Sequence, residues 1–170
     1  MTADEPTAMS SEFILANRTR GENLRLNLKG KARAYSPWIF HAHAGGCNNC
    51  DIELAACFAP RFDLERMGIQ LRNNPRHADI FLITGPAPKQ IASTLRRVYS
   101  QVPNPKIAIA CGSCAITGGV YNRDDGRPNY ALGGPVEKLI PIDVLILGCP
   151  PRPESIIEGI MLALEKLRKK

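Results

Sequence analysis

No stretch of the sequence is apolar for long enough to suggest a membrane span, because a run of 18 apolar residues does not occur. The opening segment, MTADEPTAMSSEF, is polar and acidic and lacks the basic and apolar regions of a secretory signal. Aromatic residues make up only 6% of the chain and do not alternate with basic ones, as they do in proteins that bind single strands. These absences predict a protein on the cytoplasmic side of the cell, with no nucleic-acid partner.

The six cysteines are the most informative part of the composition. A chain of 170 residues with 44% hydrophobic content can form one core, so it does not need disulfides in order to fold. Disulfides are rare in a reducing compartment, where grouped cysteines more often bind a metal or take part in catalysis. We therefore favour a metal site over a disulfide framework.

Positive charge gathers in the N-terminal part of a chain whose formal net charge is +6. Residues 17–36 carry six basic side chains against one acid, Glu22, with leucines interleaved. We interpret residues 1–36 as an extension whose basic arm lies on membrane-embedded subunits or on anionic lipid headgroups. An ordinary solvated segment is the equal alternative. Residues 37–170 form the expected domain.

The pattern from residue 37 onward predicts an α/β domain. Apolar runs bounded by Gly and Pro predict strands that are buried on both faces, as in a mainly parallel sheet. Segments with helical spacing lie between them and predict flanking helices. The expected strands are residues 38–44, 79–85, 106–110 and 144–148, and the expected helices are residues 51–58, 88–100 and 153–168. Residues 121–139 interrupt this rhythm and predict an ordered loop.

Five of the six cysteines follow predicted strands, which is the main finding from the sequence. Cys47 and Cys50 follow the first strand, Cys111 and Cys114 the third, and Cys149 the fourth. Because ligands of open α/β sheets bind beyond the carboxyl ends of the strands, these thiols converge on one edge. Four thiolates in one place, surrounded by glycines that allow close backbone approach, suit a [4Fe–4S] cluster.

Choosing four ligands from six cysteines leaves alternatives. Cys57 lies in an apolar helical segment and is expected to be a buried small hydrophobe. Cys114, which lies beyond a Gly-Ser turn, is favoured over Cys111, which ends a strand directly and remains the alternative third ligand. A zinc-stabilised interaction module with two CxxC pairs is the non-enzyme alternative. The two pairs are separated by residues 51–110, far beyond the ~15–20 residues usual for zinc. A thioredoxin-like CxxC would need only one pair.

Three further side chains near the predicted cluster are candidates for proton handling. His41 and His43 alternate along the first strand and so share a face. We interpret them as structural histidines unless they contact the cluster environment. Glu53 lies on the first turn after Cys50, where it serves either as a proton relay or as a favourable charge at a helix start.

Three combined motifs resemble one known family. They are GCNNCDIE at residues 46–53, GSCA with Gly118-Gly119, and GCPPRPE at residues 148–154. From about Pro37 onward the chain resembles the small subunit of membrane-bound, energy-converting [NiFe]-hydrogenases of the Ech and formate hydrogenlyase type. The cluster-bearing 20 kDa subunit of respiratory complex I is a relative of that family.

The resemblance implies a flavodoxin-like fold and a proximal [4Fe–4S] cluster on Cys47, Cys50, Cys114 and Cys149. It also implies a hydrogenase-like large subunit, a ferredoxin-like subunit and membrane-embedded subunits as partners, on the cytoplasmic side of the membrane. The Cys-x-x-Cys spacing at the first site favours the hydrogenase branch, since complex I relatives carry adjacent cysteines. The alternative activity is a complex I-like oxidoreductase that reduces a quinone or a sulfur compound. Two departures from the family pattern are Asn49, where glycine is expected, and the additional Cys111.

Overall fold

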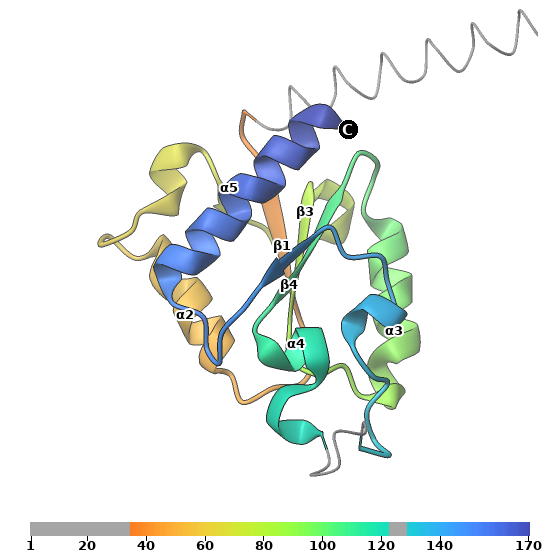
Figure 1. Cartoon of the computed structure of the whole chain (residues 1–170). Helices are drawn as coiled ribbons and strands as arrows, with labels where there is room; N and C mark the ends of the chain where they lie inside the picture. Colours follow the sequence, from red (N-terminus) through yellow and green to blue (C-terminus); the bar gives the residue numbers. More distant parts are fainter. Residues whose placement is uncertain (1–34, 123–128) are drawn as a thin grey trace, which may run out of the picture.

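A computed structural model describes residues 35–122 and 129–170 of the chain. Its centre is a five-stranded, all-parallel sheet in the order β2-β1-β3-β4-β5 (Figure 1). The strands are β1 (Trp38–His43), β2 (Gln70–Leu71), β3 (Ile80–Thr84), β4 (Ile107–Cys111) and β5 (Val144–Ile146). This order, in which the chain crosses from one half of the sheet to the other after β2, is that of flavodoxin-like folds. The predicted α/β class and parallel sheet are confirmed.

Four α-helices accompany the strands in the described residues. They are α2 (Asn49–Phe58), α3 (Lys89–Gln101), α4 (Ser113–Thr117) and α5 (Pro153–Lys169). Short 3-10 turns complete the chain: η1 (Leu64–Met67), η2 (Pro75–His77), η3 (Gly119–Tyr121) and η4 (Val136–Lys138). No described helix combines the length and the apolar character needed to cross a membrane.

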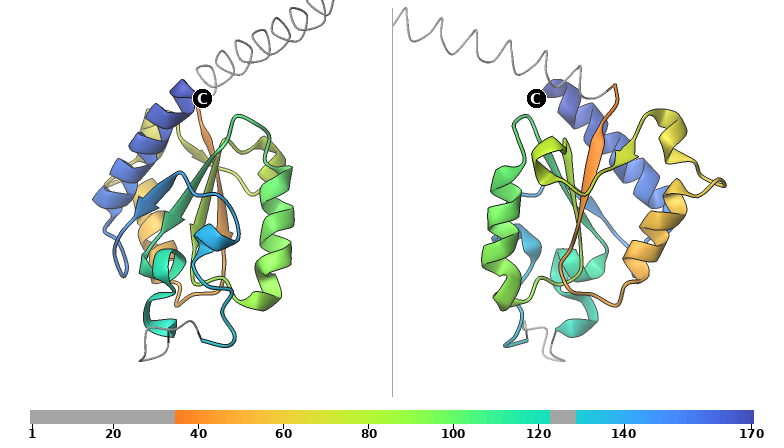
Figure 2. Two further views of the ribbon diagram at one scale, coloured as in Figure 1. Left: turned by 45° about the vertical axis from the view of Figure 1, so that its right-hand side comes forward. Right: turned by 180° about the vertical axis from the view of Figure 1, so that it is seen from behind.

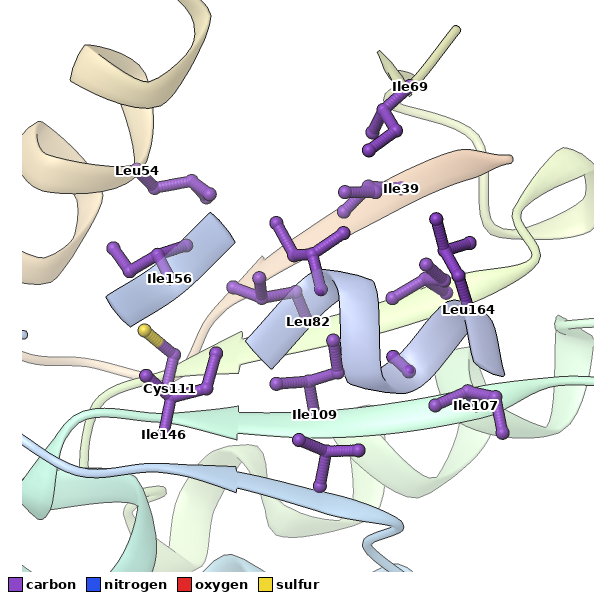
Figure 3. Close-up of a cluster of buried hydrophobic side chains, with 14 of the residues drawn as sticks. Ile39, Leu54, Ile69, Leu82, Ile107, Ile109, Cys111, Ile146, Ile156 and Leu164 are labelled. Carbon is purple, nitrogen blue, oxygen red and sulfur yellow. The ribbon is translucent and has the colours of Figure 1, made fainter. Parts of the chain in front are cut away.

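Helices cover both faces of the sheet. Helices α2 and α5 lie on one face and α3 on the other, as the two views of Figure 2 show. Strands β3 and β4 are buried along their whole length, because both of their faces are covered. On the α2 and α5 face, Ile39, Leu82, Ile109, Ile156 and Ile160 belong to one core of buried residues (Figure 3).

The sequence prediction was accurate for long elements and incomplete for short ones. Four strands were predicted, and the additional one is β2, which has only two residues. The five-residue helix α4 was not predicted either. Helix α2 begins two residues earlier than expected, after the left-handed residue Asn48, so Asp51 lies in its first turn instead of capping it. The predicted basic arm of residues 17–36 lies almost entirely outside the described residues.

Candidate metal centre

The loops that follow β1 and β3 pack backbone against backbone at the carboxyl edge of the sheet. Ala44 donates its N–H to the Thr84 carbonyl at 2.7 Å, and Ala87 donates to the Ala44 carbonyl at 3.1 Å. A side chain on Gly85, whose φ is +91°, would lie 3.0 Å from the Gly45 carbonyl carbon, so the loops approach this closely only because residue 85 is glycine. This contact holds the segment that carries Cys47 and Cys50.

The loops that follow β4 and β5 are joined in the same way. Ser113 donates both its N–H and its hydroxyl to the Gly148 carbonyl, at 2.8 and 3.0 Å. Gly148 has a φ of +144°, and a Cβ there would lie 2.4 Å from the Cα of Pro151. These contacts bring helix α4, with Cys114, beside the turn that carries Cys149.

Four thiols gather where these loops meet. Cys47, Cys50 and Cys114 line one small pocket together with His43, Asp51 and Thr84. The pKa of the Cys50 thiol is raised to about 11, by burial first and then by Cys114, Cys47, Asp51 and Cys149 in that order. The pKa of Cys114 is also raised, by burial first and then by Cys149 and Cys47. Cys50 and Cys114 therefore resist losing their protons. A bound cation would reverse that resistance, because metal binding deprotonates thiols.

The backbone leaves room for the sulfurs where side chains would fill it. A Cβ at Gly112 would lie 2.6 Å from the Cys50 sulfur, and one at Gly119 would lie 2.9 Å from the Cys114 sulfur. A backbone hydrogen bond from Val120 to Cys114 acts against the rise in the pKa of that thiol. Close glycine backbone and amide donors to sulfur are what iron–sulfur ligation requires, so the residues present fit such a group.

The remaining two cysteines lie in the core. Cys57 is fully buried and donates its thiol to the Glu53 carbonyl at 3.2 Å, which confirms its prediction as a buried small side chain. Cys111 is the last residue of β4 and is also fully buried, among Ile109, Ile146 and Ile156 (Figure 3). Burial raises the pKa of Cys111 to about 12. Cys114 lines the same pocket as Cys47 and Cys50, whereas Cys111 packs in the apolar core, and this favours Cys114 as the third ligand.

His41 and His43 have a common partner, because both rings face the carboxylate of Asp51. The His41 Nε2 lies 3.0 Å from Asp51 Oδ1, and the His43 Nδ1 lies 2.6 Å from Asp51 Oδ2. Thr84 donates its hydroxyl to Asp51 Oδ1 at 2.6 Å. Sequence reasoning placed the two histidines on one face of the strand but did not identify Asp51 and Thr84 as their partners.

Glu53 lies near the cysteines but faces a different space. It lines a cleft of about 460 Å³ together with Arg61, Phe62, Arg152 and Glu154, and none of the cysteines lines that cleft. The predicted loop region also supplies Tyr121, which sequence reasoning missed. Burial, followed by Cys47, Cys114 and Cys149, raises the pKa of the Tyr121 phenol, so this side chain lies close to three of the thiols.

Within residues 35–122 and 129–170, no three His, Cys, Asp or Glu side chains gather closely enough to hold a single metal ion. Thiolates around a [4Fe–4S] cluster bind different iron atoms, so they lie farther apart than thiolates that share one zinc. The absence of such a group from the described residues therefore argues against a site for a single metal ion. The four thiols and the glycines around them support a cluster instead.

Comparison with known proteins identifies the family. Residues 47–163 match the model of the NADH ubiquinone oxidoreductase 20 kDa subunit family, whose members bind an iron–sulfur cluster. A probable membrane-bound hydrogenase subunit of Pyrococcus furiosus is 48% identical over 134 residues, which are 79% of this chain and 77% of that protein. An NADH-quinone oxidoreductase subunit of Herpetosiphon aurantiacus is 40% identical over 141 residues, 82% of this chain and 73% of that protein.

A solved structure extends the likeness to three dimensions. The membrane-bound sulfane sulfur reductase, described as an archaeal respiratory membrane complex, contains a chain that is 38% identical to this one. The TM-score is 0.69, and the match covers 84% of this chain and 76% of that chain. The family match spans well over half of the sequence and includes all four clustered cysteines. The chain therefore belongs to the family of NADH ubiquinone oxidoreductase 20 kDa subunits.

Proposed function

We propose that this chain is the electron-transfer subunit of a membrane-associated oxidoreductase complex, and that Cys47, Cys50, Cys114 and Cys149 bind one [4Fe–4S] cluster. The observation that carries the proposal is the gathering of these four thiols where the loops after β1, β4 and β5 meet, with glycine backbone against two of the sulfurs. When bound, such a cluster would supply one-electron redox chemistry. The role of the chain is then to hold the thiolates and to set their surroundings.

The surface around the thiols supports a partner at this edge. Cys47 and Cys149 are exposed, and so are three large apolar side chains in the same loops and first helical turn: Ile52, Val120 and Leu147. Val120 is 78% exposed and Leu147 is 73% exposed. Apolar side chains that gather around a functional site are typical of protein interfaces. We therefore place the catalytic subunit over the cysteine edge, where it would cover the cluster and the neighbouring His41, His43 and Arg152.

The reaction we favour is the interconversion of protons and H₂ in a [NiFe] large subunit. A ferredoxin-like subunit would be the other electron partner, on the cytoplasmic side of the membrane. The 48% identity to a membrane-bound hydrogenase subunit and the Cys-x-x-Cys spacing support this choice. A second function is supported by one specific observation. The sulfane sulfur reductase chain is similar to this chain in both sequence and fold. Reduction of a sulfur compound or of a quinone is therefore the alternative.

The deciding experiment is purification of the native complex, followed by metal analysis and assays of both activities. In a separate measurement on this chain alone, reconstituted anaerobically, about four irons and four sulfides per chain, without zinc, would support the cluster and exclude the zinc module. Nickel together with H₂ evolution from a low-potential donor would establish the hydrogenase function. A complex without nickel that reduces polysulfide or a quinone would establish the alternative and leave the cluster in place.

A further inference from the structure

The first turn of α2 is tied to two strands through a single carboxylate. Asp51 directly follows Cys50, and its side chain is only 16% exposed. One oxygen, Oδ1, accepts the Thr84 hydroxyl of β3 at 2.6 Å and lies 3.0 Å from His41 Nε2 of β1. The other oxygen lies 2.6 Å from His43 Nδ1. The register of the sheet brings these groups together, because His43 pairs directly with Thr84.

The same contacts extend to the loop that carries Cys47. The His43 ring accepts the Gly46 N–H at Nε2, at 3.2 Å, while its Nδ1 faces Asp51. A ring that accepts at one nitrogen and donates at the other is the neutral imidazole. Asp51 therefore fixes the orientation of His43, and His43 holds the backbone next to Cys47. Both cysteines of the first motif are positioned through this network.

The network places the Asp51 carboxylate directly beside the thiol site. Thr84 and the two histidines hold that carboxylate in position. Asp51 follows Cys50 in the sequence and lines the same small pocket as Cys47, Cys50 and Cys114. A fixed negative charge beside a redox centre makes the addition of an electron less favourable.

We propose that Asp51 is a positioning residue that, held by His41, His43 and Thr84, keeps a negative charge beside Cys50 and lowers the reduction potential of the bound cluster. This inference rests on the proposed function, since it requires a cluster on Cys50. It adds a specific group that sets the direction of electron flow. A low potential suits a centre that must pass electrons to a demanding acceptor, such as protons.

Two variants of the native complex test the charge separately from the geometry. Asp51→Asn removes the charge and keeps the shape, so the midpoint potential of the cluster, measured by redox titration of its EPR signal, moves to more positive values. Thr84→Val removes a donor and leaves the carboxylate less stabilised, so the potential moves to more negative values. If the substitutions only loosened the site, the midpoint potential would shift in the same direction in both variants. The control is Glu158→Gln, which removes an exposed acid on α5 and leaves the potential unchanged.

Shifts of opposite sign support the inference, and shifts of the same sign, or none in either variant, overturn it. If Asp51→Asn fails to retain the cluster, Thr84→Val decides alone: a more negative potential supports the inference and any other result overturns it. Wild-type complex without an iron–sulfur signal would overturn the proposed function and the inference together. A normal wild-type signal that neither variant shifts overturns the inference alone.

Discussion

At the scale of single residues, the surroundings of each thiol separate the six cysteines into two groups. Four lie where loops meet at the sheet edge, and the other two, Cys57 and Cys111, are fully buried in the core. We expect serine at position 47, 50, 114 or 149 to abolish the EPR signal of the cluster after anaerobic reconstitution, because a hydroxyl does not replace a thiolate as an iron ligand. Cys57→Ser should leave the signal intact.

Comparing the serine variants of Cys111 and Cys114 decides which of the two is the third ligand. Cys111→Ser places a hydroxyl in an apolar core, which costs about 1–3 kcal/mol of stability without removing a proposed ligand. The protein should therefore melt at a lower temperature and still carry its cluster. Loss of the signal in Cys111→Ser, together with its retention in Cys114→Ser, would show that the third ligand is Cys111.

Glu53 is the residue whose role depends most on the partner. It lies in the cleft with Arg61 and Arg152, next to the edge where we place the catalytic subunit. If Glu53 relays protons, Glu53→Gln should lower hydrogen turnover by roughly 10²-fold with the cluster signal unchanged, because the amide cannot take up and release a proton. The exposed Glu158→Gln variant is the control. Normal turnover in Glu53→Gln would reduce Glu53 to a structural carboxylate.

At the residue scale, the sequence supports a prediction where the residue type itself carries the chemistry. Cysteines after strand ends indicate a site whatever their exact contacts, so the four proposed ligands could be chosen in advance. Asp51 could not be assigned in this way. Its role depends on side chains of β1 and β3 that meet only through the register of the folded sheet. Taken from the sequence, it was only a possible helix cap.

At the scale of elements, the turn between β4 and α4 carries a specific steric requirement. Gly112 has a φ of +88°, and a Cβ there would lie 2.6 Å from the Cys50 sulfur. Gly112→Ala should therefore displace a proposed ligand and lower the iron content of the purified complex. The left-handed backbone adds about 1–2 kcal/mol to the cost.

Gly134→Ala is a matched control for this substitution. Gly134 has a similar φ of +94°, but among the described residues its Cβ would meet only the Lys138 Cδ, at 3.5 Å. Gly134→Ala also places a side chain at a positive φ but does not clash with a sulfur, so the iron content of this variant should equal that of the wild type. Equal iron content in both variants would mean that Cys50 can move aside, and that Gly112 is required only for its backbone conformation.

Elements were predictable from the sequence in proportion to their length. Strands β3 and β4 are nearly continuous apolar runs, and α5 repeats its apolar residues with helical spacing over 17 residues, so each gives a clear signal in the sequence. Strand β2 contributes only Gln70 and Leu71, and α4 only five residues, too few to show any period. These short elements exist because the surrounding structure holds them in place.

At the scale of the whole molecule, the two ends of the sheet have different characters. The carboxyl ends of the strands carry the thiols and their exposed apolar neighbours. The last turn of α5, with Lys166, Arg168 and Lys169, is basic. Tyr35, the first described residue, lines a shared cleft with Arg168 and Leu164, so the described part of the chain begins beside this basic turn. The sequence of residues 17–36 adds six more basic side chains.

This arrangement predicts that deletion of residues 1–33 weakens attachment to the membrane and spares the cluster. Each basic side chain near an anionic surface contributes about 1 kcal/mol, and salt screens that attraction. Sedimentation with native membranes over a range of salt concentrations should therefore show the full-length complex releasing gradually, and the truncated complex releasing at lower salt. The EPR signal should be the same in both, since the thiols lie at the opposite end of the sheet. Attachment that does not respond to salt, or that survives the deletion unchanged, would mean that the arm is an ordinary solvated segment and that other subunits alone anchor the chain.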